Sequence, residues 1–128
     1  MARVMAVDDD QVIRGLLEVN LVMEGHEVMT AVNGQDALDQ VAQEHPDLIL
    51  LDVMMPTVNG WQVAERLKQD PATTHIPIIL LSARAMEADV RKGMDLGVQQ
   101  YVTKPFDPID LMELVDRLLD EAAADGRT

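Results

Sequence analysis

Several residue types are scarce in this chain of 128 residues, and each scarcity excludes a class of function. Cysteine is absent, which excludes disulfide bonds, thiolate catalysis and metal sites built on cysteine. Basic residues number only 10 against 23 acidic ones, so the formal net charge is −13. Nucleic acids and anionic membranes are bound by Lys and Arg that neutralise phosphates, and both repel a chain this acidic. The sequence therefore predicts no direct partner of either kind.

Long apolar runs are also missing. No segment approaches the ~20 apolar residues that cross a membrane, and the N-terminus lacks the apolar stretch of a signal peptide. We therefore expect the chain to be soluble. A cytoplasmic location agrees with the lack of cysteine, because the cytoplasm is reducing.

Short apolar runs alternate with amphipathic segments along the chain. Hydrophobic residues make up 48% of the sequence, and the length suits one domain with a buried core. Helical spacing of apolar residues predicts five helices, and the first has Ile13, Leu16, Leu17 and Leu21 on one face. The apolar runs are typical of five strands, at residues 4–7, 27–31, 48–51, 76–81 and 100–103.

Two helix starts are predicted from local chemistry. Asp10 precedes the first helix and Asp107 precedes the last one. An aspartate at this position accepts hydrogen bonds from backbone N–H groups that the helix leaves without partners. Pro108 then fits the first helical position, where its missing N–H costs nothing.

Strands that alternate with helices predict an α/β fold of three layers, with a parallel sheet between two layers of helices. Right-handed crossovers place the C-terminal end of every strand at one edge of the sheet. That edge holds the ligand crevice in open α/β sheets. We expect one such domain over residues 1–121. Residues 122–128 have no apolar pattern and are expected to be a flexible tail or the start of a linker.

Polar side chains gather at that edge of the predicted sheet. Carboxylate oxygens without histidine or cysteine suit a hard cation such as Mg²⁺. A further carboxylate can attack phosphorus, while a lysine and a hydroxyl match the negative charge of a phosphoryl group. The set therefore predicts phosphoryl transfer onto an aspartate. Its members follow four strands: Asp8 and Asp9 the first, Asp52 the third, Ser82 the fourth and Lys104 the fifth.

Four motifs carry a resemblance to a known family. VDDD, LLDVMMPTVNG, LLSA and YVTKPF occur in this order at four strand ends, within residues 3–121. Together they resemble the receiver domain of bacterial two-component response regulators, of the chemotaxis-regulator kind. The resemblance implies a flavodoxin-like fold of three αβα layers, with a five-stranded parallel sheet in the order 2-1-3-4-5 and five helices.

The resemblance also implies roles for the residues of the pocket. Asp52 would accept the phosphoryl group. Lys104, joined to Pro105 by a cis peptide bond, would pair with the phosphoryl oxygens. Mg²⁺ would be held by four residues: Asp8, mostly through a water, Asp9, Asp52 and the backbone carbonyl of Met54.

A conformational switch is implied beside the pocket. Ser82 would turn inward and hydrogen-bond the phosphoryl group, with Ala83 leaving room for it. Tyr101 would move from an outward to an inward rotamer. The weak fourth helix, predicted at 86–96 and containing Gly93, lies between them and would shift. The face that changes would be formed by the fourth helix, the fifth strand and the fifth helix.

The function implied is a phosphorylation-controlled signalling switch. A histidine kinase or a histidine phosphotransfer protein would donate the phosphoryl group, and a downstream protein or a fused output domain would respond. The chemistry would be limited to Mg²⁺-dependent phosphorylation and dephosphorylation of the chain itself, so it is not expected to be an enzyme. Met54 and Arg84 occupy positions that tune dephosphorylation in this family, and their size would hinder the attacking water.

Three other interpretations remain open. Asp8 and Asp10 spell the DxD of a haloacid-dehalogenase-like phosphohydrolase, although the chain is short for that class and the motif LLDVMMP would be unexplained. A second interpretation is a receiver module cut from a larger regulator or a hybrid kinase. The third is a receiver-like interaction module without phosphorylation, against which the complete set of pocket residues argues.

The remaining notable side chains are interpreted as structural. Trp61 is the only tryptophan and is predicted to pack on the third helix, near the pocket. The three histidines, His26, His45 and His75, lack the spacing of a metal site and are predicted to lie at the surface.

Overall fold

The apolar runs form a parallel sheet, because both of its faces are covered by helices. The structure is a computed structural model that describes residues 2–83 and 86–124. The strands lie in the order β2-β1-β3-β4-β5 and all pair in parallel, which confirms the predicted flavodoxin-like order. Their bounds are β1 (Arg3–Val7), β2 (Glu27–Ala31), β3 (Leu48–Asp52), β4 (Ile78–Ser82) and β5 (Gln100–Thr103).

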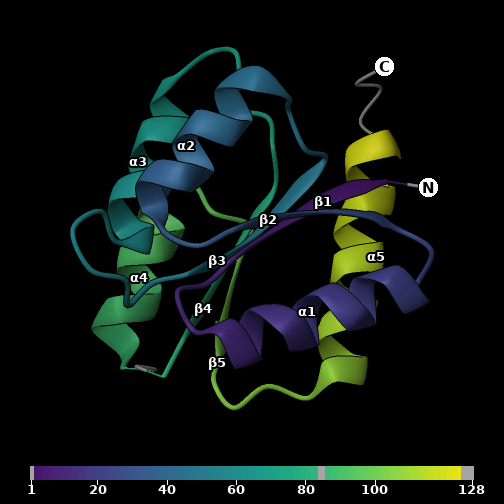
Figure 1. The fold of residues 1–128 in the computed structure, drawn as a ribbon. Helices are drawn as coiled ribbons and strands as arrows, with labels where there is room; N and C mark the ends of the chain where they lie inside the picture. The colour runs from purple at the N-terminus through teal and green to yellow at the C-terminus, as the bar shows by residue number, and fades with distance from the viewer. Residues whose placement is uncertain (1, 84–85, 125–128) are drawn as a thin grey trace.

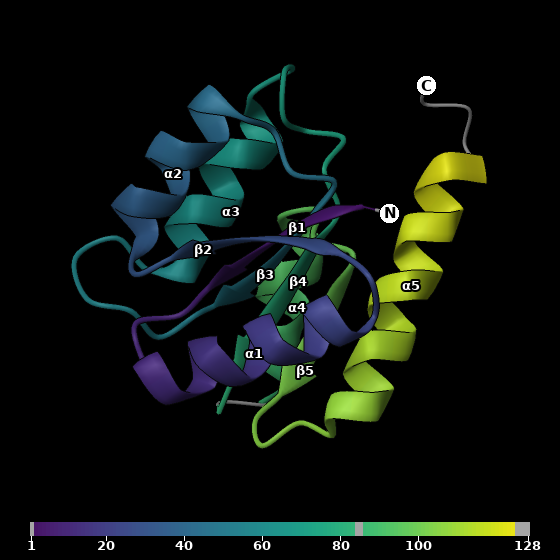
Figure 2. The same cartoon turned by 45° about the vertical axis from the view of Figure 1, so that its right-hand side comes forward.

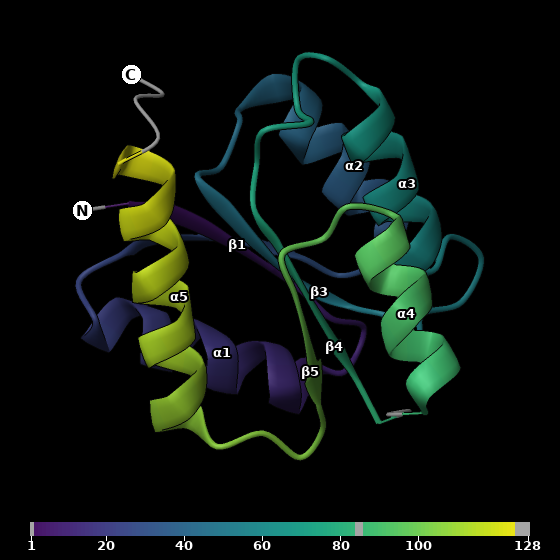
Figure 3. The same cartoon turned by 180° about the vertical axis from the view of Figure 1, so that it is seen from behind.

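Five helices cover the sheet in two layers. One layer holds α1 (Gln11–Met23) and α5 (Pro108–Ala124), and the other holds α2 (Gly34–Gln43), α3 (Gly60–Gln69) and α4 (Glu87–Asp95). Figures 1 and 2 show the two layers on opposite faces of the sheet, and Figure 3 shows them from behind. Alternate strand residues feed two separate cores: Met5 and Val7 pack on the α2–α4 side, while Val4 and Ala6 pack on the α1–α5 side.

The predicted helix caps are confirmed. The side chain of Asp10 accepts hydrogen bonds from Val12 N at 2.8 Å and Ile13 N at 3.3 Å. Asp107 does the same at the start of α5, accepting from Ile109 N at 2.8 Å. Both helices therefore start where an aspartate satisfies their first free N–H groups.

Four strand boundaries differ from the predicted ones: the start of β1, the end of β3 and both ends of β4. β4 begins at Ile78 rather than at residue 76, because Pro77 has no N–H to donate to the strand ladder. The carbonyl of Ile76 instead accepts a hydrogen bond from Lys68 Nζ at 2.7 Å. β3 extends one residue further than predicted and ends in Asp52, which pairs with Leu81 of β4. Asp52 is therefore held by the sheet itself.

Leu16 does not share the buried face of α1, and its predicted burial is wrong. α1 rests on the sheet through Leu17 and Leu21, which are fully buried, whereas Leu16 is 42% exposed. Leu16 instead joins an outer stripe of four exposed apolar residues at intervals of three and four: Val12, Leu16, Val19 and Met23.

The C-terminal helix continues beyond the predicted domain end. α5 extends through Ala124, and residues 125–128 lie outside the described residues. The boundary at residue 121 stays a prediction. Among the described residues, no helix combines the length and the apolar character that crossing a membrane requires.

Candidate functional site

Three carboxylates converge at the C-terminal edge of the sheet. Asp8 follows β1, Asp9 comes next in the chain, and Asp52 ends β3. One carboxylate oxygen from each lies within 4.8 Å of those of the other two, the one such acidic group found among the described residues. Asp8 and Asp52 are buried while Asp9 is exposed, so the group opens to solvent on one side. A donor set made only of oxygens fits Mg²⁺.

Lys104 connects the two buried carboxylates. Its Nζ lies 2.9 Å from Asp8 Oδ2 and 3.1 Å from Asp52 Oδ1. The lysine follows β5, and its backbone N donates to the carbonyl of Ser82 at 2.8 Å. The peptide bond between Lys104 and Pro105 is cis, as the resemblance implied. The ammonium group thus offsets part of the negative charge of Asp8 and Asp52, which are 44 residues apart in the sequence.

Asp8 is fixed by the turn that leads into α1. Its Oδ1 accepts a hydrogen bond from Asp10 N at 2.9 Å, and its carbonyl accepts one from Arg14 Nη1 at 2.9 Å. These contacts leave Oδ2 to face Lys104. The position of this carboxylate is therefore set by the chain that follows it.

Burial and charge change the acidity of the site. Burial raises the pKa of Asp52 from 3.8 to about 6, and the neighbouring carboxylate of Asp8 adds to the rise, while Lys104 opposes it. Burial lowers the pKa of Lys104, but the hydrogen bonds and charges of Asp8 and Asp52 outweigh that effect and raise it overall. The site therefore holds more negative charge than its single lysine offsets.

The loop after Asp52 returns close to the strand end. A Cβ at Gly60 would collide with the carbonyl oxygen of Asp52, so only glycine fits there. Gly60 N donates to the carbonyl of Val53 at 2.9 Å, which ties the start of α3 to the end of β3. Met54 N lies 3.4 Å from Asp52 Oδ1, and the Met54 side chain points outward with 53% of the residue exposed.

The other predicted pocket residues lie on β4 and β5 or within two residues after them. Ser82 is fully buried at the end of β4, next to Leu81, the residue that pairs with Asp52. Ala83 and Pro105 are exposed beside it. Tyr101 is buried on β5, 9% exposed, and faces α3 and α4. Arg84 lies outside the described residues, so its predicted role has no structural context here.

Asp10 does not join the carboxylate group. Its side chain is occupied as the N-cap of α1, and the group of converging oxygens contains Asp9 instead. A phosphohydrolase that uses Asp8 and Asp10 is therefore not favoured by this arrangement.

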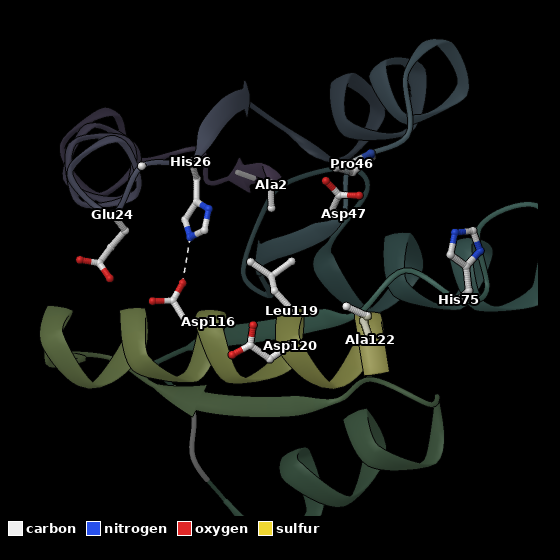
Figure 4. A pocket seen from close by; sticks show the side chains of 12 residues that line it. Ala2, Glu24, His26, Pro46, Asp47, His75, Asp116, Leu119, Asp120 and Ala122 are labelled. Carbon is white, nitrogen blue, oxygen red and sulfur yellow. Dashed lines mark hydrogen bonds and ion pairs between the residues drawn. The ribbon is translucent and has the colours of Figure 1, made fainter. Parts of the chain in front are cut away.

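A hollow lies at the opposite edge of the sheet. It has a volume of about 1050 Å³, and Figure 4 shows its lining from α5 and from the loops before β2, β3 and β4. His26 Nε2 lies 2.9 Å from Asp116 Oδ1 across this hollow, and its side chain is only 10% exposed. The predicted surface position of His26 is wrong, because the turn at Gly25 folds it against α5. His45 and His75 are exposed, as predicted.

Comparison with known proteins identifies the family. A family model of the response regulator receiver domain matches residues 4–116. The chain belongs to this family. It is similar to the DNA-binding dual master transcriptional regulator RpaA of Synechocystis sp., with 40% identity over 119 residues. It is also similar to the phosphate regulon transcriptional regulatory protein PhoB of Pseudomonas aeruginosa, with 44% identity over 115 residues.

The aligned part is a fraction of these relatives. It covers 93% and 90% of this chain but 49% of RpaA and 49% of PhoB, so the chain spans about half the length of these relatives. Solved structures agree on the fold. A CheY-like receiver domain protein from Methanospirillum hungatei JF-1 superposes with a TM-score of 0.92 at 26% identity, covering 98% of both chains. The chemotaxis protein CheY4 of Vibrio cholerae gives 0.86 at 31% identity, covering 91% of this chain and 98% of its own.

Proposed function

We propose that this receiver domain is a signalling switch whose phosphoacceptor is Asp52. The observation that supports this most strongly is the position of Lys104 Nζ, 2.9 Å from Asp8 and 3.1 Å from Asp52. A phosphoryl group on Asp52 would bring new negative oxygens to the place where this ammonium group already lies. Preorganised positive charge at the point where negative charge develops is the main requirement of phosphoryl transfer.

The phosphoryl transfer exchanges one bond to phosphorus for another. An oxygen of Asp52 bonds to phosphorus as the P–N bond of a phosphohistidine breaks, and the electron pair of that bond returns to the imidazole nitrogen. The donor is a histidine kinase or a histidine phosphotransfer protein. With its pKa at about 6, the Asp52 carboxyl is mostly ionised at pH 7 and able to attack. Such chemistry on its own side chain would not make the chain an enzyme.

Asp8, Asp9 and Asp52 are proposed to hold Mg²⁺, with the backbone carbonyl of Met54 as a further ligand. The three carboxylate oxygens are close enough to share one ion, and Asp9 leaves the group open to the water molecules that Mg²⁺ keeps. When bound, the ion supplies positive charge against the carboxylates and the phosphoryl oxygens.

Phosphorylation is proposed to move α4. It adds about −1.5 to −2 charges and new acceptor oxygens, for which the hydroxyl of Ser82 at the end of β4 and the ammonium group of Lys104 after β5 are the proposed partners. α4 is suited to move, because no side chain among the described residues caps its start and because it contains Gly93. The face formed by α4, β5 and α5 would then present different contacts to a partner.

The outer stripe of α1 is proposed as the docking surface of the phosphoryl donor. α1 begins at Gln11, directly after the acidic group, so a protein that delivers a phosphoryl group to Asp52 covers this helix as well. Val12, Leu16 and Val19 are exposed at the spacing that receives an apolar helix face. Gly15 lies beside them with nothing within 4 Å of where its Cβ would be, which lets a helix approach closely.

The output is proposed to be a protein contact. Because the chain spans about half the length of RpaA and PhoB, the receiver either acts on a separate effector or is followed by an output domain in a longer protein. Its net charge of −13 argues against direct binding of nucleic acid or of an anionic membrane by this part. The cytoplasmic location stays a prediction.

Chemical labelling tests the proposal. The protein is incubated with acetyl phosphate and Mg²⁺, trapped with borohydride and digested, and the labelled peptide is identified by mass spectrometry. We expect the label on Asp52, and none in Asp52→Asn. Asp10→Asn is the matched control, because asparagine still caps α1, and it should label normally. A label on Asp8 would refute the proposal and favour a phosphohydrolase.

Met54 and Arg84 are proposed to slow the loss of the phosphoryl group. Met54 is 53% exposed and its backbone N lies 3.4 Å from Asp52 Oδ1, so its side chain would be close enough to hinder a water that attacks the phosphoryl group. The double variant Met54→Ala, Arg84→Ala should lose phosphate faster than the wild type. The rate is measured as the decay of the labelled protein after the donor is removed, and an unchanged lifetime would contradict the role.

A further inference from the structure

Tyr101 rests on the only tryptophan of the chain. The ring centroids of Trp61, on α3, and Tyr101, on β5, lie 5.8 Å apart with the planes inclined by 30°. Tyr101 is 9% exposed and belongs to the core on the α2–α4 side of the sheet. Aromatic pairs at this separation attract each other beyond the effect of buried area. The buried rotamer of Tyr101 is therefore stabilised by a ring on α3.

Gly93 of α4 packs close to the rings of both Trp61 and Tyr101. A Cβ at Gly93 would lie 3.1 Å from Leu80 Cδ1, 3.3 Å from Trp61 Cζ3 and 3.3 Å from Tyr101 Cδ2. Lys92, the residue before it, places its Nζ 4.8 Å from the centroid of the Trp61 ring. Trp61, Leu80 and Gly93 together form what we call the Tyr101 seat. Trp61 is its one member on α3 and contacts α4 and β5 at once.

The seat is also connected to the phosphoacceptor strand. Trp61 directly follows Gly60, the residue that packs on the carbonyl of Asp52 and donates its N–H to Val53 at 2.9 Å. No side chain lies between these backbones, since Gly60 has none. A movement of the backbone at the end of β3 is therefore passed directly to the Cα and Cβ atoms of Trp61, because no other side chain lies between them.

We propose that Trp61 is a positioning residue that holds Tyr101 in its buried rotamer and couples that rotamer to the Asp52 end of β3. The first half rests on packing alone, whereas the second half rests on the proposed phosphorylation of Asp52. Coupling between two sites is reciprocal. If a phosphoryl group on Asp52 favours buried Tyr101, then loss of the seat must weaken the binding of a phosphoryl mimic.

The single tyrosine makes a direct experiment possible. 3-Fluorotyrosine is incorporated, so that one ¹⁹F resonance reports Tyr101. Its broadening by a soluble nitroxide measures exposure and does not depend on the ring current that a Trp61 substitution removes. Beryllofluoride with Mg²⁺ is the phosphoryl mimic, and its affinity is measured by calorimetry. The variants are Trp61→Leu, Trp61→Phe and, as a control, Leu119→Ala, which shortens a partly buried side chain on the opposite face of the sheet.

We expect Trp61→Leu to expose Tyr101 to the nitroxide and to weaken beryllofluoride about three- to tenfold, in line with the loss of one aromatic pair. Trp61→Phe should retain most of both properties, and Leu119→Ala should change neither. A folded Trp61→Leu protein in which Tyr101 stays protected would overturn the seat. Exposure of Tyr101 with unchanged beryllofluoride affinity would overturn the coupling to Asp52.

Two further outcomes of the experiment each have a measurement that decides them. If Trp61→Leu does not fold, Gly93→Ala tests the seat with Trp61 in place, because the added methyl group crowds both rings; it should expose Tyr101, and continued protection would overturn the seat. If the wild type binds no beryllofluoride, the proposed function fails and the coupling fails with it. The nitroxide measurement then still decides whether Trp61 holds Tyr101.

Discussion

The two edges of the sheet both gather acidic residues, and only one of them has the arrangement of a chemical site. At the C-terminal edge, oxygens of Asp8, Asp9 and Asp52 lie within 4.8 Å of one another, and two of the three residues are buried. At the N-terminal edge, four acids line a hollow of about 1050 Å³ (Figure 4): Glu24, Asp47, Asp116 and Asp120.

The difference lies in how each carboxylate is compensated. Asp47 accepts a hydrogen bond from the backbone N of Arg3 at 2.8 Å, and Asp116 pairs with His26. Glu24 and Asp120 are exposed, so water solvates them. At the other edge, Asp8 and Asp52 share one lysine and have almost no solvent. Convergence and burial, rather than the number of acids or the size of a hollow, therefore indicate where a cation and a phosphoryl group bind.

Of the substitutions that test this comparison, Lys104→Met should change the free energy of unfolding most. The substitution keeps the length of the side chain but leaves two buried carboxylates without their cation, and removal of one partner from a buried ion pair costs about 3–5 kcal/mol. We expect the free energy of unfolding, measured by urea denaturation in EDTA at neutral pH, to fall by that amount. Added Mg²⁺ should restore part of it.

Lys92→Met is the matched control, because Lys92 is exposed and its ammonium group lies over the face of Trp61, 4.8 Å from the ring centroid, rather than between buried carboxylates. A surface change of this kind should stay within about 1 kcal/mol. Equal losses from the two lysines would mean that burial does not distinguish the C-terminal edge.

Asp52→Asn should act in the opposite direction and stabilise the metal-free protein. The pKa of Asp52 is raised from 3.8 to about 6 in the fold, so the ionised carboxyl costs free energy at neutral pH. Removal of that charge should raise the free energy of unfolding by about 2–3 kcal/mol at pH 7–8 in EDTA. The gain should shrink as pH falls through 6 and vanish below about 4, where both folded and unfolded forms are protonated.

The matched control for this variant is Asp120→Asn at the N-terminal edge of the sheet. Asp120 is exposed, so its substitution should change stability by less than about 0.5 kcal/mol at any pH in this range. A pH-independent difference between wild type and Asp52→Asn would show that the buried charge of Asp52 is not the cause.

The order and type of the elements were predictable, because each depends on local pattern. Alternating apolar runs and helical spacing determine an α/β sheet, and Asp10 and Asp107 cap their helices as local chemistry requires. The errors arise where the pattern is ambiguous. Leu16 lies three or four residues from members of both the buried and the exposed face of α1, so spacing alone does not assign it to one of them. The residues just before β4 have the apolar character of a strand, but Pro77 has no N–H for the strand ladder.

The convergence of Asp8, Asp52 and Lys104 was predictable for a different reason. Parallel strands bring their C-terminal ends together whatever the intervening sequence, and the four motifs mark those ends. Nothing comparable marks the contact of His26 with Asp116, which are 90 residues apart. The pairing of Trp61 with Tyr101 depends equally on how α3 packs on β5, which no spacing in the sequence reveals.

Among the substitutions that remove a contact, Asp116→Ala should have the smallest effect, and it tests the N-terminal edge directly. The substitution removes the partner of His26 Nε2, but the Asp116 side chain is 45% exposed, so water replaces part of the lost bond. We expect a loss of about 1 kcal/mol in urea denaturation. The yield of label on Asp52 should not change, because His26 and Asp116 lie at the opposite end of the strands. A loss of labelling in a folded Asp116→Ala protein would mean that this edge takes part in the chemistry, and the contrast between converged and dispersed acids would then fail as a guide to the site.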